Sequence, residues 1–209
     1  MIRHFLTAVL LLATAALSHA QFTPANSPIK ISDIKPSLEK SPEFTIGVGP
    51  QRKATSQDWL WIEVSYTYTP KIANPPPIDD LAVNYYILLD NKSKDAPAGT
   101  LLTGTITHTG VTPGTDIHHS VALVSPQTLR RYFNGKPPAN IAGVFQAIGV
   151  TISVQGALAA EMSIGKGKGR PQWWQQFPAT ANLVLSKDQT PFAPLFYDYF
   201  DAVKAKGGQ

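Results

Sequence analysis

The sequence predicts a mainly β protein, an antiparallel β-sandwich with one or two short helices. Apolar and polar residues alternate with a period of two in several short runs, which is the pattern of half-buried strands. Turn residues separate these runs, and the 18 prolines lie mainly between them. Because long helices do not alternate with the strands, the pattern favours a sandwich over a parallel α/β sheet.

The clearest strand covers residues 59–69, which alternate over their whole length. One face carries Leu60, Ile62, Val64, Tyr66 and Tyr68, and the other carries Trp59, Trp61, Glu63, Ser65 and Thr67. Aromatic and β-branched residues of this kind are typical of strands. We therefore expect one face to lie in the core, and the two tryptophans to face either solvent or a second layer.

Five further strands are expected from the same pattern, over residues 81–90, 100–109, 117–124, 144–155 and 157–164. Residues 91–99 contain Asn, Asp, Pro and Gly and predict a hairpin loop, and Gly156 predicts a tight turn or bulge. Two shorter runs, 29–34 and 43–48, are interrupted by Pro36 and Pro42. Since proline is confined to sheet edges, these runs are predicted to be edge strands.

A helix is expected over residues 125–134, where Ser125 is an N-cap, Pro126 opens the first turn and Gly135 follows. A second helix is expected over residues 190–204, where another Thr-Pro pair precedes an apolar stripe at helical spacing. The stripe consists of Leu195, Phe196, Tyr199, Phe200 and Val203.

The first 20 residues are interpreted as a cleaved signal peptide. Arg3 gives a positive start, residues 5–17 form an apolar run, and Ser18-His19-Ala20 places small residues at the cleavage positions. The mature chain then begins at Gln21 and is expected to form one domain over residues 21–209. An irregular N-terminal arm is the alternative to edge-strand structure for residues 21–42. The apolar run is too short to span a bilayer, so no transmembrane segment is expected in the mature chain. The protein is expected to be exported to the periplasm, cell surface or extracellular space.

Composition narrows the function classes. The chain has no cysteine, which excludes disulfides, thiolate metal ligands and a thiol nucleophile. Its net charge of +4 is mild and scattered, so no nucleic acid partner is expected.

Catalytic motifs are absent from the sequence, so no catalytic, cofactor-binding or metal-ligating residue is predicted. His118 and His119 are adjacent on a strand and point to opposite faces, so they cannot share an ion, and His108 lies on the preceding strand. Five carboxylates are candidates for acid–base groups, but Asp79 and Asp80 are expected in a loop, and Asp188, Asp198 and Asp201 are expected on a helix.

A candidate interaction surface combines a basic loop with aromatic residues. Glycines alternate with Lys166, Lys168 and Arg170, but no P-loop pattern follows. A mobile basic connection is the favoured interpretation, with contact to an anion or acidic glycan as the alternative. The aromatic members are Trp59, Trp61, Trp173 and Trp174, which either stack on sugars or, as we favour, pack as core or interface residues.

Several segments of the sequence resemble those of a known protein family. They are strand 59–69, residues 121–126 leading into Arg130-Arg131-Tyr132, the pair Trp173-Trp174, and Thr190-Pro191-Phe192-Ala193-Pro194. In these the chain resembles a small group of exported verrucomicrobial proteins. The resemblance implies an immunoglobulin-like β-sandwich and a pilus-like protein associated with a type IV pilus-type apparatus. A type IV prepilin keeps its apolar helix, whereas here the apolar run is expected to be lost, which favours an accessory role.

The sequence therefore predicts a non-enzymatic exported structural or interaction protein, an accessory component of a type IV pilus-like or cell-envelope assembly. Its expected partners are other envelope or pilus-type subunits, with a homo-oligomer as a second option. Edge strands and aromatic patches are the surfaces expected to associate. The alternative function is a surface protein that binds carbohydrate, such as mucin-type glycans.

Overall fold

The structure is a computed structural model that describes residues 26–43, 56–91, 99–136, 140–196 and 198–205. The expected signal peptide, most of the 91–99 loop and nearly all of the 43–48 run lie outside these residues.

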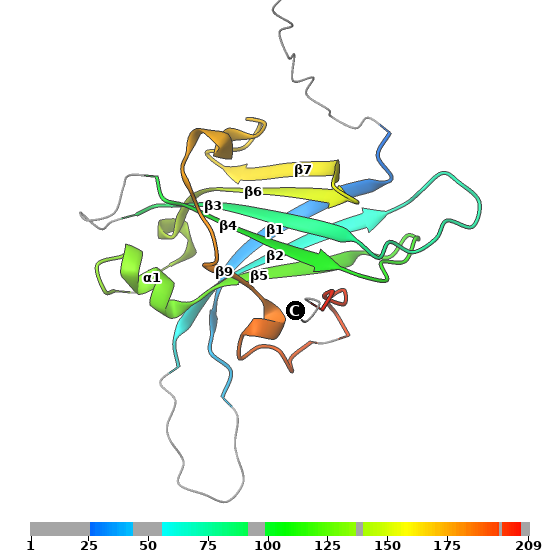
Figure 1. Cartoon of the computed structure of the whole chain (residues 1–209). Coiled ribbons are helices and arrows are strands. Elements are labelled where there is room, and N and C mark those ends of the chain that lie inside the picture. The colour runs from blue at the N-terminus through cyan, green and yellow to red at the C-terminus, as the bar shows by residue number, and fades with distance from the viewer. Residues whose placement is uncertain (1–25, 44–55, 92–98, 137–139, 197, 206–209) are drawn as a thin grey trace, which may run out of the picture.

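Two β-sheets are stacked face to face, which confirms the predicted sandwich (Figure 1). The first sheet has the order β1-β2-β5-β9 and the second β7-β6-β3-β4-β8. The strands are β1 (Ile29–Lys40), β2 (Asp58–Tyr68), β3 (Leu81–Leu89), β4 (Leu101–His108), β5 (His118–Val124), β6 (Phe145–Val154), β7 (Ala157–Gly165), β8 (Ala179–Thr180) and β9 (Val184–Ser186). All pairings are antiparallel except β4 with β8.

The strand order matches the immunoglobulin arrangement. Strands β1, β2 and β5 take the places of A, B and E, and β7, β6, β3 and β4 those of G, F, C and C′. The place of strand D beside β5 is filled by β9, which comes from the C-terminal part of the chain. The sheets also approach at both lateral edges, where β1 lies beside β7 and β9 beside β4.

The core fills the space between the sheets with the inward residues of alternating strands. Leu60, Ile62 and Val64 of β2 and Val83 and Ile87 of β3 are fully buried in one apolar cluster. This is the face of strand 59–69 that the alternation predicted to be inward. The Gln155-Gly156 turn between β6 and β7 has positive φ at both residues, as a type I′ hairpin turn requires.

Strand β1 is longer than the sequence predicted. It pairs with β2 from Ile29–Tyr68 to Lys40–Asp58, and Pro36 lies opposite Ile62 within the paired region. Proline is tolerated because β1 is the edge of its sheet. The interpretation of residues 21–42 as an irregular arm is therefore wrong for residues 29–40.

The first predicted helix is confirmed as α1 (Pro126–Tyr132), at one end of the sandwich (Figure 1). Ser125 is its N-cap, with Oγ accepting a hydrogen bond from the amide of Thr128 at 3.2 Å. Buried Leu129 anchors the helix to the core. Three short 3₁₀ turns, η1 (Ile141–Gly143), η2 (Trp173–Gln176) and η3 (Lys187–Gln189), complete the described elements.

The second predicted helix, over residues 190–204, is wrong. Ala193, Leu195 and Tyr199 donate to carbonyls three residues earlier, so the segment is a series of turns. Pro194 disfavours helical geometry at the residue before it, and Phe196 has a φ of 52°. Of the apolar stripe, Leu195 and Phe200 pack on the outer face of the first sheet, whereas Phe196 and Tyr199 are exposed.

The C-terminal strap, residues 179–205, connects the two sheets. It pairs with the second sheet through β8, crosses to the first through β9, and returns to the end of β4. There Thr109 and Lys204 donate backbone hydrogen bonds to Ala202 and Thr107, at 3.0 and 2.7 Å. The strap thereby covers the outer face of β2 and β5. Within the described ranges, no helix has the length and apolarity needed to cross a membrane.

Candidate functional site

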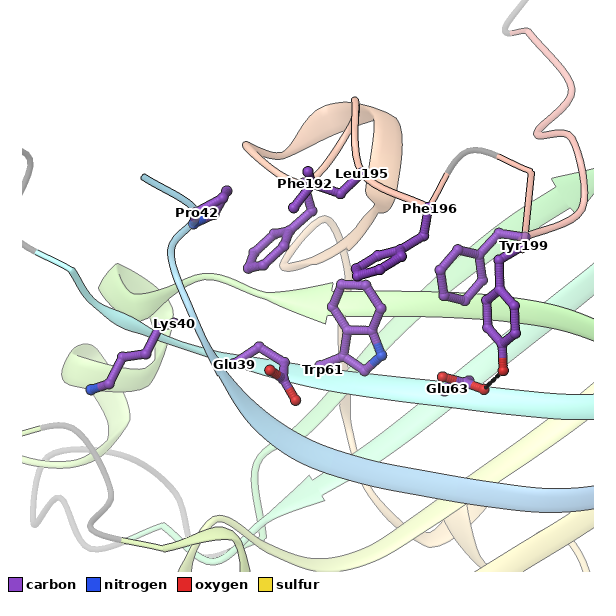
Figure 2. Close-up of a pocket in the computed structure, with 10 residues that line it drawn as sticks. Glu39, Lys40, Pro42, Trp61, Glu63, Phe192, Leu195, Phe196 and Tyr199 are labelled. Carbon is purple, nitrogen blue, oxygen red and sulfur yellow. Dashed lines mark hydrogen bonds between the residues drawn. The ribbon is translucent and has the colours of Figure 1, made fainter. Parts of the chain in front are cut away.

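An apolar groove of about 610 Å³ lies on the outer face of the first sheet, between the strap and the ends of β1 and β2 (Figure 2). We call it the aromatic groove. Its lining residues are Glu39, Lys40, Pro42, Trp61, Glu63, Phe192, Leu195, Phe196, Tyr199 and Phe200. Its volume is in the range of pockets that hold small ligands or side chains.

The floor of the groove is built by outward-facing residues of β2. Trp59 and Trp61 alternate with the core residues, so both indoles point away from the core and are covered by the strap. Phe192 meets both indoles edge to face, with ring centroids 5.8 and 5.3 Å apart, and Phe200 contacts Trp61 in the same way at 5.6 Å. These geometries stabilise aromatic pairs, so the floor is held by several aromatic contacts.

The lip of the groove exposes two aromatic rings. Phe196 is 61% exposed and Tyr199 is 48% exposed, although both lie beside a well-packed cluster. Figure 2 shows Phe196 above the Trp61 indole and Tyr199 above Glu63. Exposed aromatic area next to a preformed groove is typical of a binding surface.

A polar cluster closes one end of the groove. Tyr199 donates its hydroxyl hydrogen to Glu63 Oε1 at 2.8 Å, and His119 Nδ1 lies 3.1 Å from the same oxygen. The His119 and Tyr199 rings stack at 4.1 Å. Desolvation, together with the adjacent Glu63, raises the pKa of Tyr199 to about 12. The phenol is therefore neutral at physiological pH, and it orients the carboxylate.

The charged groups of the groove are mainly acidic. Glu39 and Glu63 contribute carboxylates, and Ser37 donates a hydrogen bond to Glu39 at 2.7 Å. Among the described lining residues the only basic one is Lys40, which pairs with Asp58 at 2.7 Å. The groove thus carries negative charge on a chain whose net charge is positive.

A buried lysine behind the groove stabilises the turns of the strap that form the groove wall. The ammonium group of Lys187 donates to the carbonyls of Phe192, Ala193 and Leu195, and lies 5.9 Å from the Phe200 ring centroid. Desolvation lowers the pKa of Lys187, while three carbonyl acceptors use all three N–H bonds of the charged form. Lys187 therefore ties the turns of the strap that carry the aromatic rings.

The predicted interaction residues are only partly brought together. All four tryptophans are buried, and of them only Trp61 lines the aromatic groove. Trp174 stacks on Tyr86 at 4.2 Å, and Trp173 donates from Nε1 to Ser163 at 3.1 Å. The favoured interpretation of the tryptophans as packed residues therefore agrees with the structure, and the alternative of solvent-facing indoles does not. Binding by these tryptophans stays a prediction.

The basic loop lies on the second sheet, away from the groove. Lys168 and Arg170 donate backbone hydrogen bonds to Gly165 and Gly167, at 3.1 and 3.0 Å. A Cβ on Gly167 would come within 2.3 Å of Trp173 Nε1, so the loop packs closely on that indole. The side chains of Lys168 and Arg170 are exposed, and within the described residues neither makes an ion pair.

The histidines take part in two separate networks. His118 lies 2.9 Å from Asp201 Oδ1, whose other oxygen accepts from Tyr66 at 2.6 Å. His119 contacts Glu63 instead, so the two neighbours meet different carboxylates, as their alternation requires. Among the described residues, no three His, Asp or Glu side chains are grouped as metal ligands.

His108 is buried and belongs to the network that contains Asp201. Its Nε2 lies 2.7 Å from the Ser120 hydroxyl, which also accepts from Tyr85 at 2.8 Å, and its Nδ1 lies 3.1 Å from the Asp201 carbonyl. Serine and histidine have the spacing of a nucleophile and base, but both are buried in the core. Burial lowers the pKa of His108, against a smaller opposing effect of Asp201. The neutral ring satisfies both contacts by donating from Nδ1 and accepting at Nε2.

The other carboxylates that the sequence offered as candidate acid–base groups lie in several parts of the fold. Asp79 accepts from the Gly110 amide at 3.1 Å, and Asp80 pairs with Lys204 at 3.3 Å. Asp188 lies in the first turn of η3. Asp188 and Asp201 line a common pocket with His108 and Lys187, whereas Asp79 and Asp80 are not among its lining residues.

Of the residues that line the groove, the sequence pointed only to Trp61 as an interaction residue. Phe196, Tyr199 and Phe200 belong to the predicted helical stripe, and Phe192, Glu39 and Glu63 belong to no predicted site. The second proline of the Thr-Pro-Phe-Ala-Pro segment was the available signal, because it argues against a regular helix.

Comparison with known proteins supports the fold. A protein-family model matches residues 20–207. A crystal structure from Akkermansia muciniphila superposes with a TM-score of 0.67 and 19% sequence identity, covering 86% of this chain and 94% of that chain. At this identity the likeness shows the shared fold. No curated protein sequence matches the chain.

Proposed function

We propose, for a chain that belongs to the family whose model matches residues 20–207, that it is an exported, non-enzymatic interaction protein of a pilus-type or other cell-envelope assembly. The aromatic groove is the surface through which it docks. The observation that supports this is the exposure of Phe196 and Tyr199 at the lip of an apolar groove. The likeness to an Akkermansia structure supports the verrucomicrobial resemblance.

Three sets of residues would contribute to docking at the groove in different ways. Trp61 and Phe192 provide a floor that is already ordered before binding, so little conformational entropy is lost. Phe196 and Tyr199 provide apolar area that a partner removes from water. Glu39 and Glu63 provide acceptors that fix the partner's orientation.

The test is site-specific crosslinking in intact cells. A photoreactive amino acid in place of Phe196 should capture a defined envelope protein, which mass spectrometry identifies. The matched control is the same amino acid in place of Ile72, which is 65% exposed but outside the groove. Equal capture from both positions, or from neither, would contradict docking at the groove.

Carbohydrate binding is the second candidate, and one observation favours it. Tyr199 presents an exposed ring beside the Glu63 carboxylate, and an aromatic face next to a hydrogen-bond acceptor suits a sugar ring. A mucin-type glycan array separates the two functions. Glycan binding that is lost in Tyr199→Ala, without loss of fold, would support the sugar-binding function over assembly.

Export is part of the proposal and has its own test. The signal-peptide pattern in residues 1–20 predicts that the protein in the envelope or secreted fraction starts at Gln21. N-terminal sequencing decides this. A product that retains residues 5–17 would instead indicate a membrane-anchored subunit.

A further inference from the structure

We infer that the occupant of the aromatic groove is the basic loop, residues 165–170, of a second copy of this chain. The inference rests on the proposed docking function and names its partner. It follows from three features: the charge of the groove, the charge and order of the loop, and the positions of both on the sandwich.

The charges of the two surfaces are complementary. Among its described lining residues the groove presents the carboxylates of Glu39 and of Glu63, whose Oε1 is shared with Tyr199 and His119. Lys40, the lysine of this set, is already paired with Asp58. The loop presents Lys168 and Arg170 as exposed cations. An arginine guanidinium can stack on the Phe196 or Tyr199 ring and donate to a carboxylate at once, which suits a groove lined by both.

The loop is ordered before binding. Two turn hydrogen bonds span Gly165–Lys168 and Gly167–Arg170, and the Lys166 amide donates to the Gln146 carbonyl at 2.9 Å. Gly167 packs on the Trp173 indole, so the loop is held as a short rigid projection. A preformed loop entering a preformed groove loses little entropy, which favours association.

The positions of the two surfaces exclude contact within one molecule. The loop follows β7 at the edge of the second sheet, whereas the groove lies on the outer face of the first sheet. A loop-to-groove contact therefore joins two copies head to tail. Such a heterologous interface leaves a free loop on one copy and a free groove on the other, so the chain of copies can extend.

The experiment is a charge exchange measured by sedimentation velocity over a concentration series. We expect Glu39→Lys, and separately Lys168→Glu with Arg170→Glu, each to weaken self-association about tenfold or more at low salt. Neither site lies in the core, and circular dichroism verifies that each variant is folded. Lys30→Glu with Lys71→Glu is the control, because both lysines are exposed and lie outside the loop and the groove.

Mixing the two variants gives the decisive result. In an equimolar mixture every loop meets a groove of opposite charge, so association should return to near the wild-type level. A mixture that stays dissociated, a wild-type protein that stays monomeric, or variants that associate normally would each overturn the inference. Crosslinking from Phe196 to a different protein would then leave the proposed function standing, whereas no crosslink from Phe196 would refute that function itself.

Discussion

Lys187 is the residue on which the shape of the groove depends most directly. Its ammonium group replaces water as the hydrogen-bond donor for three strap carbonyls in a buried position. Removing the donor leaves these acceptors without a partner, which costs more than the lost contacts alone. A single charged side chain thus supports an otherwise irregular segment.

The first prediction is that Lys187→Met lowers the free energy of unfolding by about 1.5–3 kcal/mol, the usual cost of losing hydrogen bonds to a charged group. Chemical denaturation measures this. Lys71→Met is the control, because Lys71 is exposed. An unchanged stability would mean that the three carbonyls find other donors.

The second prediction concerns His108. Because burial lowers its pKa in the folded protein, the unfolded chain, with a histidine pKa near 6.5, binds the proton more tightly. The contribution to stability is therefore complete above about pH 6.5 and is lost as the pH falls below it. Denaturation between pH 7.5 and 5 should show this decline.

His108→Gln isolates that contribution, since its amide can donate to the Asp201 carbonyl and accept from Ser120. His118 and His119 remain in both proteins, so the difference in pH dependence belongs to His108. We expect a shallower decline in the variant. Parallel curves for the two proteins would contradict the prediction.

At the scale of elements, strands β2 and β6 are each covered on both faces. The outer face of β2 packs under the strap, and β6 supports the Trp173–Trp174 turn over the second sheet. At Gly149 of β6 the Trp174 ring lies so close that a Cβ would be 2.6 Å from it. The close approach explains glycine in a strand, where it is otherwise unfavourable.

The third prediction is that Gly149→Ala lowers the free energy of unfolding by about 1–3 kcal/mol, as overpacked substitutions do. Gly114→Ala is the control, because the nearest atom to its Cβ would be 3.9 Å away. Thermal or denaturant unfolding compares the two. A neutral Gly149→Ala would show that the Trp174 ring moves aside freely.

At the scale of the whole molecule, the strap makes the two sheets one unit. It contributes a strand to each sheet, and its Asp201 carboxylate contacts both Tyr66 and His118, whose rings stack on each other. Its aromatic residues also cover Trp59 and Trp61. Stability of the fold and formation of the groove therefore depend on the same segment.

The fourth prediction is that removing residues 190–209 lowers the free energy of unfolding by at least about 3 kcal/mol, the cost of losing one buried phenylalanine such as Phe192. Tryptophan emission should shift to longer wavelength as Trp59 and Trp61 meet water. Phe196→Ser is the control, since this side chain is already 61% exposed. A truncated protein with unchanged emission would contradict the role of the strap as a cover.

The sequence by itself determined the sandwich, because alternation with a period of two records which strand face is buried. It located β2 to β7 and α1, and it placed the turn at Gly156. It was wrong about residues 190–204, where Leu195 and Phe200 are apolar because they pack with Trp59 and Trp61 and not because they lie on a helix. A periodic pattern says that side chains are buried, but not which surface buries them.

Only the tertiary structure decided the candidate site. Glu39 and Trp61 come from β1 and β2, whereas Phe196 and Tyr199 come from the strap, more than a hundred residues later in the chain, and no local motif connects the strands with the strap. Lys187, which stabilises the strap beside these residues, donates hydrogen bonds to backbone carbonyls. Every residue has a backbone carbonyl, so the sequence does not show which ones accept these bonds. The groove arises because the chain returns across a sheet whose outer face is already aromatic, and this juxtaposition exists only once both sheets have formed.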